Sequence, residues 1–174
     1  MSLGLYLHIP YCFSKCRYCD FYSHPGERGV PEAYVDALLR ELSRFAPEAP
    51  LQPDTLYFGG GTPSLLRPEQ AKRLIEAARP MPGAEITLEA NPETVTEESL
   101  AGFREAGVNR ISFGVQSARD TQLRTLGRPH TAKQARAAFA AARRAGFTNI
   151  SGDIMLALPH YTEAEFDETL ELIE

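Results

Sequence analysis

The chain has little of three features that would point directly to a function: cysteine, excess positive charge and long apolar segments. Its three cysteines are too few and too closely spaced for a disulfide framework. The formal net charge is -5, so a role in nucleic-acid binding has no electrostatic support. The apolar stretch at 3–9 contains His8 and is followed by Pro10, which makes it too short to span a bilayer. No Lys or Arg precedes it as in a signal peptide, so we expect a cytoplasmic protein without membrane contact.

The composition is that of an ordinary globular protein. The 174 residues are 43% hydrophobic and 24% charged, which is enough for one domain with a sizeable apolar core. We therefore expect residues 1–174 to form a single domain.

Short apolar runs alternate with segments of helical periodicity, and this alternation predicts an α/β fold with a parallel sheet. The predicted strands are 3–9, 55–59, 86–90, 111–114 and 150–156. They are apolar and often β-branched or aromatic, as is typical of buried parallel strands. Five strands cannot close an eight-stranded barrel. The sheet is therefore open or belongs to a longer chain, and we favour a longer chain.

Local signals mark the predicted helices. The first helix has one apolar face, formed by Val35, Leu38, Leu42 and Phe45. Capping residues begin three later helices: Thr96, Thr131 with Gln134, and Thr162 with Glu165. Gly107 and Gly146 each follow a helix and precede a strand, where glycine allows the left-handed conformation that ends a helix.

The three cysteines form a C-x-x-x-C-x-x-C motif, Cys12, Cys16 and Cys19, directly after the first predicted strand. Thiolates are the usual ligands of iron–sulfur clusters, and three of them in a loop can hold three corners of a cubic cluster. The fourth iron then stays open to another ligand, much as catalytic zinc keeps an open position. Buried structural cysteines do not normally cluster in a polar loop. A zinc site completed by His8 or His24 is the alternative, and the position after a strand favours the cluster.

Further polar or glycine-rich residues lie where the predicted strands end. The segment 59–63 follows the second strand, Glu89 ends the third, Gln116 follows the fourth, and Asp153 lies within the fifth. Ligands collect at the carboxyl ends of parallel strands. Glycines let a charged ligand approach backbone N–H groups, although three glycines can also form a simple turn. Because Asp153 is flanked by apolar residues, we expect its carboxylate to have a partner.

Four phrases follow one another along essentially the whole chain: 6–10 before the cysteine motif, then 59–64, 89–92 and 114–117. In this order they resemble the radical-SAM group of oxygen-independent coproporphyrinogen III oxidases and their relatives, the HemW-type heme chaperones. The resemblance implies a partial (β/α)6 barrel of parallel strands. About five β/α units would be present here, and the family's C-terminal region would be absent.

The resemblance also implies the cofactors. Cys12, Cys16 and Cys19 match ligands of a [4Fe–4S] cluster whose open iron takes the amino and carboxylate groups of S-adenosylmethionine (SAM). Residues that match SAM-site positions are Tyr6, Tyr18, Gly60, Gly61, Thr62, Glu89, Gln116, Arg128 and Asp153. The implied reaction is reductive cleavage of SAM to methionine and a 5′-deoxyadenosyl radical. His130 and His160 have the features of surface residues, and we assign neither a role.

Two features favour the heme-chaperone branch of the resemblance. The oxidases carry a fourth cysteine just past the third, in a C-x-C pattern, and a longer stretch before the motif. Here Asp20 and Phe21 follow Cys19, and the motif begins at residue 12. The implied function is to bind heme and deliver it to a partner protein, with an electron-donor protein as a further partner. The alternatives are an oxidoreductase that uses SAM to decarboxylate coproporphyrinogen III to protoporphyrinogen IX, and a zinc-binding structural domain. One phrase, 156–161, departs from the family's Tyr-Gly-Leu-Pro-Gly-Gln.

Overall fold

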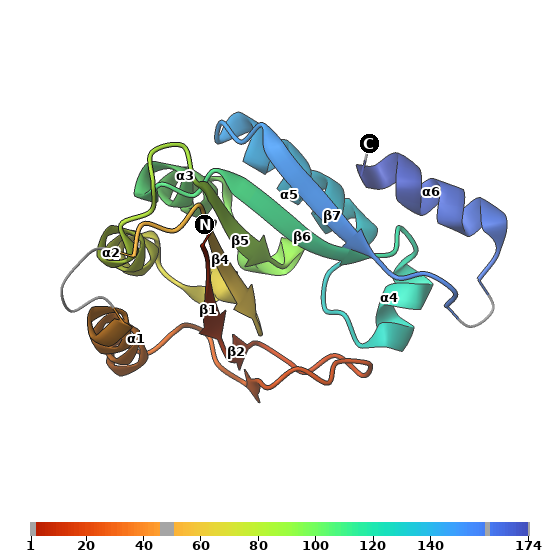
Figure 1. Cartoon of the computed structure of the whole chain (residues 1–174). Helices are drawn as coiled ribbons and strands as arrows, with labels where there is room; N and C mark the ends of the chain where they lie inside the picture. The colour runs from red at the N-terminus through yellow and green to blue at the C-terminus, as the bar shows by residue number, and fades with distance from the viewer. Residues whose placement is uncertain (1–2, 46–50, 159–160, 174) are drawn as a thin grey trace.

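The computed structural model describes residues 3–45, 51–158 and 161–173. Its main feature is an open sheet of five parallel strands in the order β1-β4-β5-β6-β7 (Figure 1). Their bounds are β1 Gly4–Ile9, β4 Thr55–Gly60, β5 Glu85–Ala90, β6 Arg110–Gln116 and β7 Asn149–Ile154. The predicted α/β fold with parallel strands is confirmed. Because all five strands run the same way, their carboxyl ends meet at one edge, below which the cysteine segment crosses (Figure 1).

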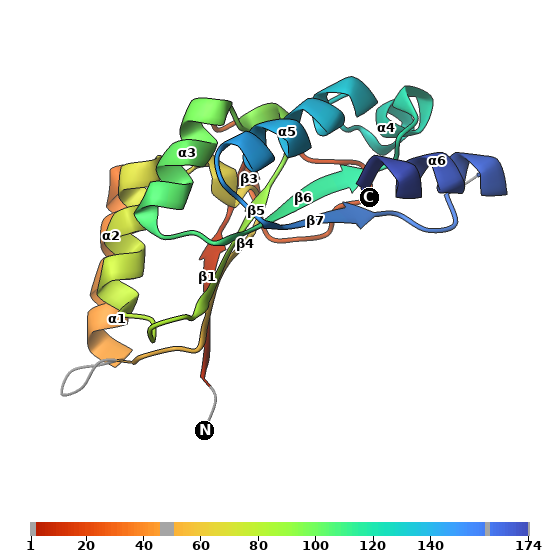
Figure 2. The ribbon, with the colours of Figure 1, turned by 90° about the horizontal axis from the view of Figure 1, so that it is seen from above.

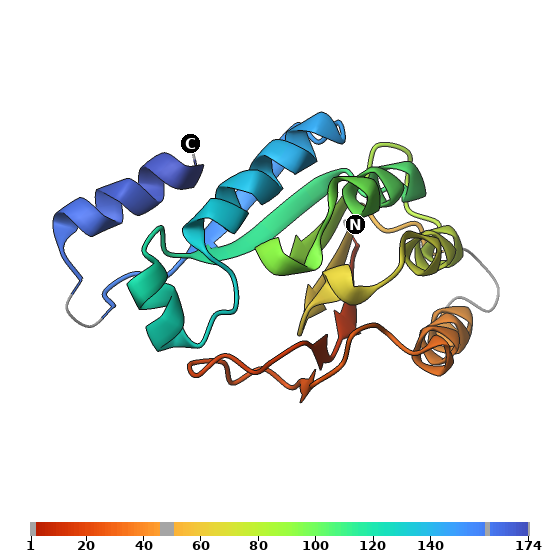
Figure 3. The same cartoon turned by 180° about the vertical axis from the view of Figure 1, so that it is seen from behind.

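Helices follow the strands and cover one face of the sheet. Their bounds are α1 Glu32–Phe45, α2 Pro68–Ala78, α3 Glu97–Ala106, α4 Asp120–Leu126, α5 Ala132–Arg144 and α6 Glu163–Ile173, with short 3₁₀ turns η1 Pro63–Leu65 and η2 Pro92–Thr94. In Figure 2, α1, α2, α3 and α5 lie on the same side of the strands. Seen from behind, α5 lies on the near side of the sheet, alongside β6 (Figure 3). We call this side the covered face and the opposite side the open face.

The capping residues predicted from the sequence are found at the starts of three helices. The Thr96 and Thr131 side chains accept hydrogen bonds from the backbone N–H groups of Ser99 and Gln134. Thr162 Oγ1 accepts in the same way from the N–H of Glu165 at 3.4 Å. Gly107 and Gly146 have φ angles of 113° and 89°, as expected for residues that end a helix.

The apolar core lies between the covered face and the helices. Each strand directs alternate side chains to this face, and those of the first four strands are buried: Leu7, Ile9, Leu56, Phe58, Ile86, Leu88, Ile111 and Phe113. Each such side chain contributes about 1.5–3 kcal/mol relative to an exposed one. The remaining residues of the same strands face the open side and are mostly polar. Among the described residues, helices cover one face of the sheet, and the strands are buried on that face.

Other local expectations need correction. Helix α4, which stands between β6 and α5, was not predicted. The cysteine segment contains two short strands, β2 Tyr11–Cys12 and β3 His24–Pro25, which pair in parallel. Phe45 is 73% exposed and so lies off the buried face that Val35 and Leu42 form on α1. Strand β6 continues beyond its predicted end to Gln116.

Two further expectations concern the C-terminal part and membranes. Pro159 and His160, within the phrase that departs from the family, lie outside the described residues. Across the described ranges, no helix has both the length and the apolar character needed to cross a membrane.

Candidate functional site

The carboxyl ends of the strands and the cysteine segment enclose a cavity of about 290 Å³. All predicted site residues except Tyr6 line it: Cys12, Cys16, Tyr18, Cys19, Gly60, Gly61, Thr62, Glu89, Gln116, Arg128 and Asp153. They come from the cysteine segment, the ends of four strands and the turn after α4. Residues far apart in the sequence are thus brought to one place, as ligand sites of parallel β/α folds require.

The cysteine segment presents three free thiols to this cavity. Cys12 is buried at the end of β2, and the backbone N–H of Cys19 donates to the carbonyl oxygen of Cys16 at 3.1 Å in a tight turn. The tip of the segment is held on α4, because the N–H of Arg17 donates to the carbonyl oxygen of Leu126 at 3.0 Å. The loop therefore has a defined conformation in which all three cysteines line one cavity.

The glycines after β4 leave room for this loop. A Cβ on Gly61 would lie 2.8 Å from the Tyr11 carbonyl oxygen and 2.9 Å from Cys12 Sγ. Gly60 has a φ of 118°, and its N–H donates to Glu89 Oε2 at 3.1 Å. The triple glycine is thus more than a simple turn, since a side chain at 61 would collide with a cysteine that lines the cavity.

Glu89 is held at the end of β5 by two donors. Tyr57 Oη donates to Oε1 at 2.7 Å, and the Gly60 N–H donates to Oε2. Burial raises the pKa of Glu89 above its ordinary value, and the nearby Asp153 raises it further, although the two hydrogen bonds act in the opposite direction. The site therefore combines a carboxylate that is costly to ionise with donors that orient it.

Asp153 has a different environment from the one expected. It has the predicted partner, because Ser112 Oγ donates to Oδ1 at 3.2 Å. It is nevertheless exposed on the open face, since its apolar neighbours Ile150 and Ile154 point to the other side of β7. Ser112, which lines the same cavity, was missed at the sequence level, and its alternation with buried Ile111 and Phe113 is the signal that identifies it.

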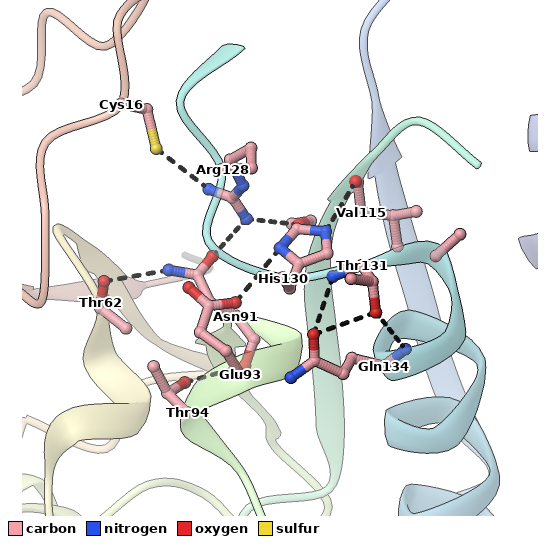
Figure 4. A network of polar contacts seen from close by, with 12 residues as sticks. Cys16, Thr62, Asn91, Glu93, Thr94, Val115, Arg128, His130, Thr131 and Gln134 are labelled. Carbon is pink, nitrogen blue, oxygen red and sulfur yellow. Dashed lines mark hydrogen bonds and ion pairs between the residues drawn. The ribbon is translucent and has the colours of Figure 1, made fainter. Parts of the chain in front are cut away.

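A chain of hydrogen bonds connects two cysteine sulfurs, and Figure 4 shows its part from Thr62 through Asn91 and Arg128 to Cys16. Thr62 Oγ1 donates to Cys12 Sγ at 3.5 Å and accepts from Asn91 Nδ2 at 3.1 Å. Asn91 Oδ1 accepts from the Arg128 guanidinium at 2.7 Å, and the same guanidinium donates to Cys16 Sγ at 3.5 Å. Asn91 also lines the cavity and was not predicted, although it lies only two residues after Glu89.

Gln116 and Tyr6 differ in their relation to the cavity. Gln116 adopts a φ of 68° at a register shift in β6, a left-handed conformation that is uncommon outside glycine and often found at ligand sites. Tyr6 lies on β1 and is 54% exposed; its ring stacks on Tyr57 with centroids 6.0 Å apart, and its hydroxyl lies 3.1 Å from His8 Nδ1. Tyr6 thus contacts the residue that holds Glu89 and does not itself line the cavity.

Both histidines of the alternative zinc site contact Tyr22. His8 Nε2 lies 3.1 Å from the Tyr22 carbonyl oxygen, and His24 Nε2 lies 3.3 Å from the Tyr22 hydroxyl. Among residues 3–45, 51–158 and 161–173, no three His, Cys, Asp or Glu side chains are grouped to hold a single metal ion. His130 is 2% exposed, so its assignment to the surface was wrong.

Comparison with known proteins decides the family. A model of the radical SAM superfamily matches residues 6–173. The chain belongs to the radical SAM superfamily. The heme chaperone HemW of Haemophilus influenzae is 39% identical over 183 residues, covering 99% of this chain and 48% of that protein. The heme chaperone HemW of Escherichia coli is 42% identical over 163 residues, covering 90% of this chain and 43% of that protein.

The solved structures agree. Coproporphyrinogen III oxidase (HemN) from Escherichia coli, described as a radical SAM enzyme, superposes with a TM-score of 0.86 at 32% identity. The match covers 98% of this chain and 41% of the oxidase. The chain spans about half the length of the curated relatives it matches. The sheet described above therefore corresponds to part of a radical SAM barrel.

The site fits the cofactors that the radical SAM family implies. Three free thiols line one cavity, and two of them already accept hydrogen bonds from Thr62 and Arg128. Such donors stabilise the negative charge that cluster-bound sulfur carries. The rest of the wall is polar, with glycine backbone and the carboxylates of Glu89 and Asp153, and suits a zwitterionic ligand.

Proposed function

We propose that this chain is the radical-SAM core of a heme chaperone. The proposal places a [4Fe–4S] cluster on Cys12, Cys16 and Cys19 and SAM in the same cavity. The observation that carries it is a single cavity lined by three free cysteines, by donors to two of their sulfurs and by a polar wall. Relatives at 39% and 42% identity that are named heme chaperones support the branch.

The residues of the chain have distinct parts in this proposal. Three cysteines hold the cluster, which when bound supplies one electron to SAM and leaves one iron open. Glu89, oriented by Tyr57 and Gly60, accepts hydrogen bonds from the amino group of SAM. The other proposed SAM contacts are Tyr18, Gly60, Gly61, Thr62, Gln116, Arg128 and Asp153, and Tyr6 supports the wall through Tyr57. Free thiols persist in a reducing compartment, so we propose a cytoplasmic location.

The proposed cargo is heme, delivered to a partner protein, with an electron-donor protein as a further partner. The absence of a cysteine two residues after Cys19, where Phe21 stands, supports this branch over the oxidase. The second candidate is oxidative decarboxylation of coproporphyrinogen III, which the structural likeness to the Escherichia coli oxidase favours. Both candidates share the cluster and SAM and differ in whether a porphyrinogen is consumed.

One anaerobic experiment separates these candidates. The reconstituted protein is titrated with heme while the Soret band is followed, and is then incubated with coproporphyrinogen III, SAM and a reductant. We expect stoichiometric heme binding, no vinyl product and no 5′-deoxyadenosine beyond the level without porphyrinogen. The Escherichia coli oxidase serves as the positive control for turnover. Formation of protoporphyrinogen IX, or failure to bind heme, would contradict the chaperone proposal.

A further inference from the structure

A buried acid–base pair lies close to the cavity but does not line it. His130 Nδ1 is 3.2 Å from Glu93 Oε2, and the two side chains are 0% and 13% exposed. His130 Nε2 lies 3.2 Å from the carbonyl oxygen of Val115, which only accepts, so Nε2 carries a hydrogen. The Nδ1–Oε2 contact has the distance of an ion pair but not the geometry of a hydrogen bond, and it is favourable when the imidazole is protonated. A charged imidazole and the carboxylate then compensate each other in a place where an unpaired charge is costly.

This bridge joins the same two segments as the contact between Asn91 and Arg128. Asn91 and Glu93 are two residues apart at the end of β5 and in η2, while Arg128 and His130 are two residues apart between α4 and α5. Asn91 contacts Arg128, and Glu93 contacts His130. We call these four residues the two-rung clamp. Figure 4 shows both rungs side by side, with the first one continuing toward Cys16.

The clamp fixes a side chain that would otherwise be flexible. Arg128 is only 9% exposed, and holding a long arginine in one rotamer costs side-chain entropy. Its guanidinium also donates to the carbonyl oxygen of Gly114. A Cβ on Gly114 would lie 2.8 Å from the Arg128 guanidinium and 3.0 Å from Asn91 Oδ1, so a glycine leaves the required space. Several groups thus converge on one orientation of Arg128.

That orientation directs a positive charge at a cysteine sulfur. Arg128 donates to Cys16 Sγ at 3.5 Å, while its other hydrogen bonds go to Asn91 Oδ1 and the Gly114 carbonyl oxygen. A cation and a hydrogen bond at a cluster sulfur favour the more negative, reduced cluster and so raise its reduction potential. A residue that keeps Arg128 in place therefore affects the reduction potential of the cluster without touching the cluster.

We propose that Asn91, Glu93 and His130 are positioning residues that hold Arg128 against Cys16 and thereby raise the reduction potential of the cluster. The inference rests on the proposed function, because it needs a cluster on the three cysteines. It adds three residues to which the sequence analysis gave no role. Asn91 lines the cavity, whereas Glu93 and His130 do not.

The test is an EPR-monitored redox titration of the reconstituted protein. Glu93→Ala breaks the second rung, and Asn91→Ala breaks the first. We expect each to make one-electron reduction about tenfold less favourable, which corresponds to a potential about 59 mV more negative. Glu93→Gln is the conservative variant, because its amide can donate to a neutral Nδ1; it should restore most of the wild-type potential. Glu97→Ala is the matched control, since Glu97 pairs with Arg144 in an exposed ion pair.

The outcomes distinguish this inference from the proposed function. A wild-type protein that takes up no cluster overturns the proposed function and the inference with it. A wild-type cluster whose potential is the same in Glu93→Ala and Asn91→Ala overturns the inference alone, even if both variants melt at lower temperature. If Glu93→Ala fails to fold, Asn91→Ala carries the same expectation. A potential that shifts in Glu97→Ala as much as in these variants also counts against the clamp.

Discussion

The two faces of the sheet are built from the same five strands and have opposite properties. On β4 the neighbours Tyr57 and Phe58 point to opposite sides: Phe58 is fully buried under the helices, and Tyr57 holds Glu89 on the open face. The covered face is made of apolar residues that stabilise the fold, whereas the open face and its carboxyl-end rim are polar and form the cavity. Because strand residues alternate, stability and ligand binding are encoded in alternate positions of one segment.

The largest expected difference between the faces is in stability. Phe58→Ala should lower the free energy of unfolding by about 3–5 kcal/mol, because it leaves a cavity in the core. Tyr57→Phe, one residue away on the open face, removes a single hydrogen bond and should cost about 1 kcal/mol. Urea denaturation of both variants measures the difference. Equal losses would mean that the two faces do not divide the roles as described.

The next expected effect is on cluster loading. Gly61→Ala places a Cβ within 3 Å of Cys12 Sγ in the wild-type geometry, so the loop must move and the reconstituted protein should lose most of its iron. In the control Gly29→Ala, the added Cβ meets only the Leu65 carbonyl oxygen at 4.0 Å. Iron and sulfide analysis after reconstitution checks both. Full iron loading of Gly61→Ala would show that the close fit between Gly61 and Cys12 is not required for cluster binding.

A smaller effect concerns SAM affinity and pH. Glu89→Gln should weaken SAM binding about tenfold, the loss expected for about 1.4 kcal/mol of hydrogen bonding to a charged group. Burial raises the pKa of Glu89, whose neighbours are Tyr57, Asp153 and His8. The folded state then binds more protons than the unfolded state, so stability falls as pH rises from the ordinary carboxyl value through the raised pKa.

Glu89→Gln should remove this loss of stability with rising pH. Thermal unfolding of the cofactor-free protein from acid to neutral pH should therefore show a variant that gains stability relative to wild type as pH rises. Parallel profiles for the two proteins would contradict the raised pKa. Isothermal titration with SAM measures the affinity in the same pair.

The smallest expected effect is on the open face away from the cavity. Ser151 Oγ donates to Ser112 Oγ at 3.0 Å, but Ser151 does not line the cavity. Ser151→Ala should change the free energy of unfolding by about 0.5 kcal/mol or less and leave SAM affinity unchanged. Ser112→Ala removes the donor to Asp153 and should reduce SAM affinity slightly. If Ser151→Ala weakens SAM binding more than Ser112→Ala, the extent of the site is different from that described.

Much of the fold was predictable because its signals are local. The apolar half of each strand, the caps at Thr96 and Thr131, and the glycine at 107 depend on neighbouring residues alone. The strand-end residues of the site were predictable for a topological reason, since parallel strands bring their carboxyl ends together. The cysteine motif could be recognised from the spacing of its three residues alone.

The rest depended on contacts between distant segments. His130 was assigned to the surface because nothing near it in sequence reveals Glu93, which is its partner in the fold. Asn91 acquires its role from Arg128 and Thr62, neither of them a neighbour in sequence. The open face was missed because periodicity in a strand shows which residues alternate, but does not show whether a second layer covers the other side.

The central claim is that the cavity at the strand ends holds a cluster with one open iron beside a SAM site. Anaerobic reconstitution with iron and sulfide, followed by EPR of the dithionite-reduced protein with and without SAM, tests it most directly. We predict a [4Fe–4S]⁺ signal whose g values change when SAM is added. A protein that takes up no cluster, or a cluster signal that SAM does not alter, would contradict the claim.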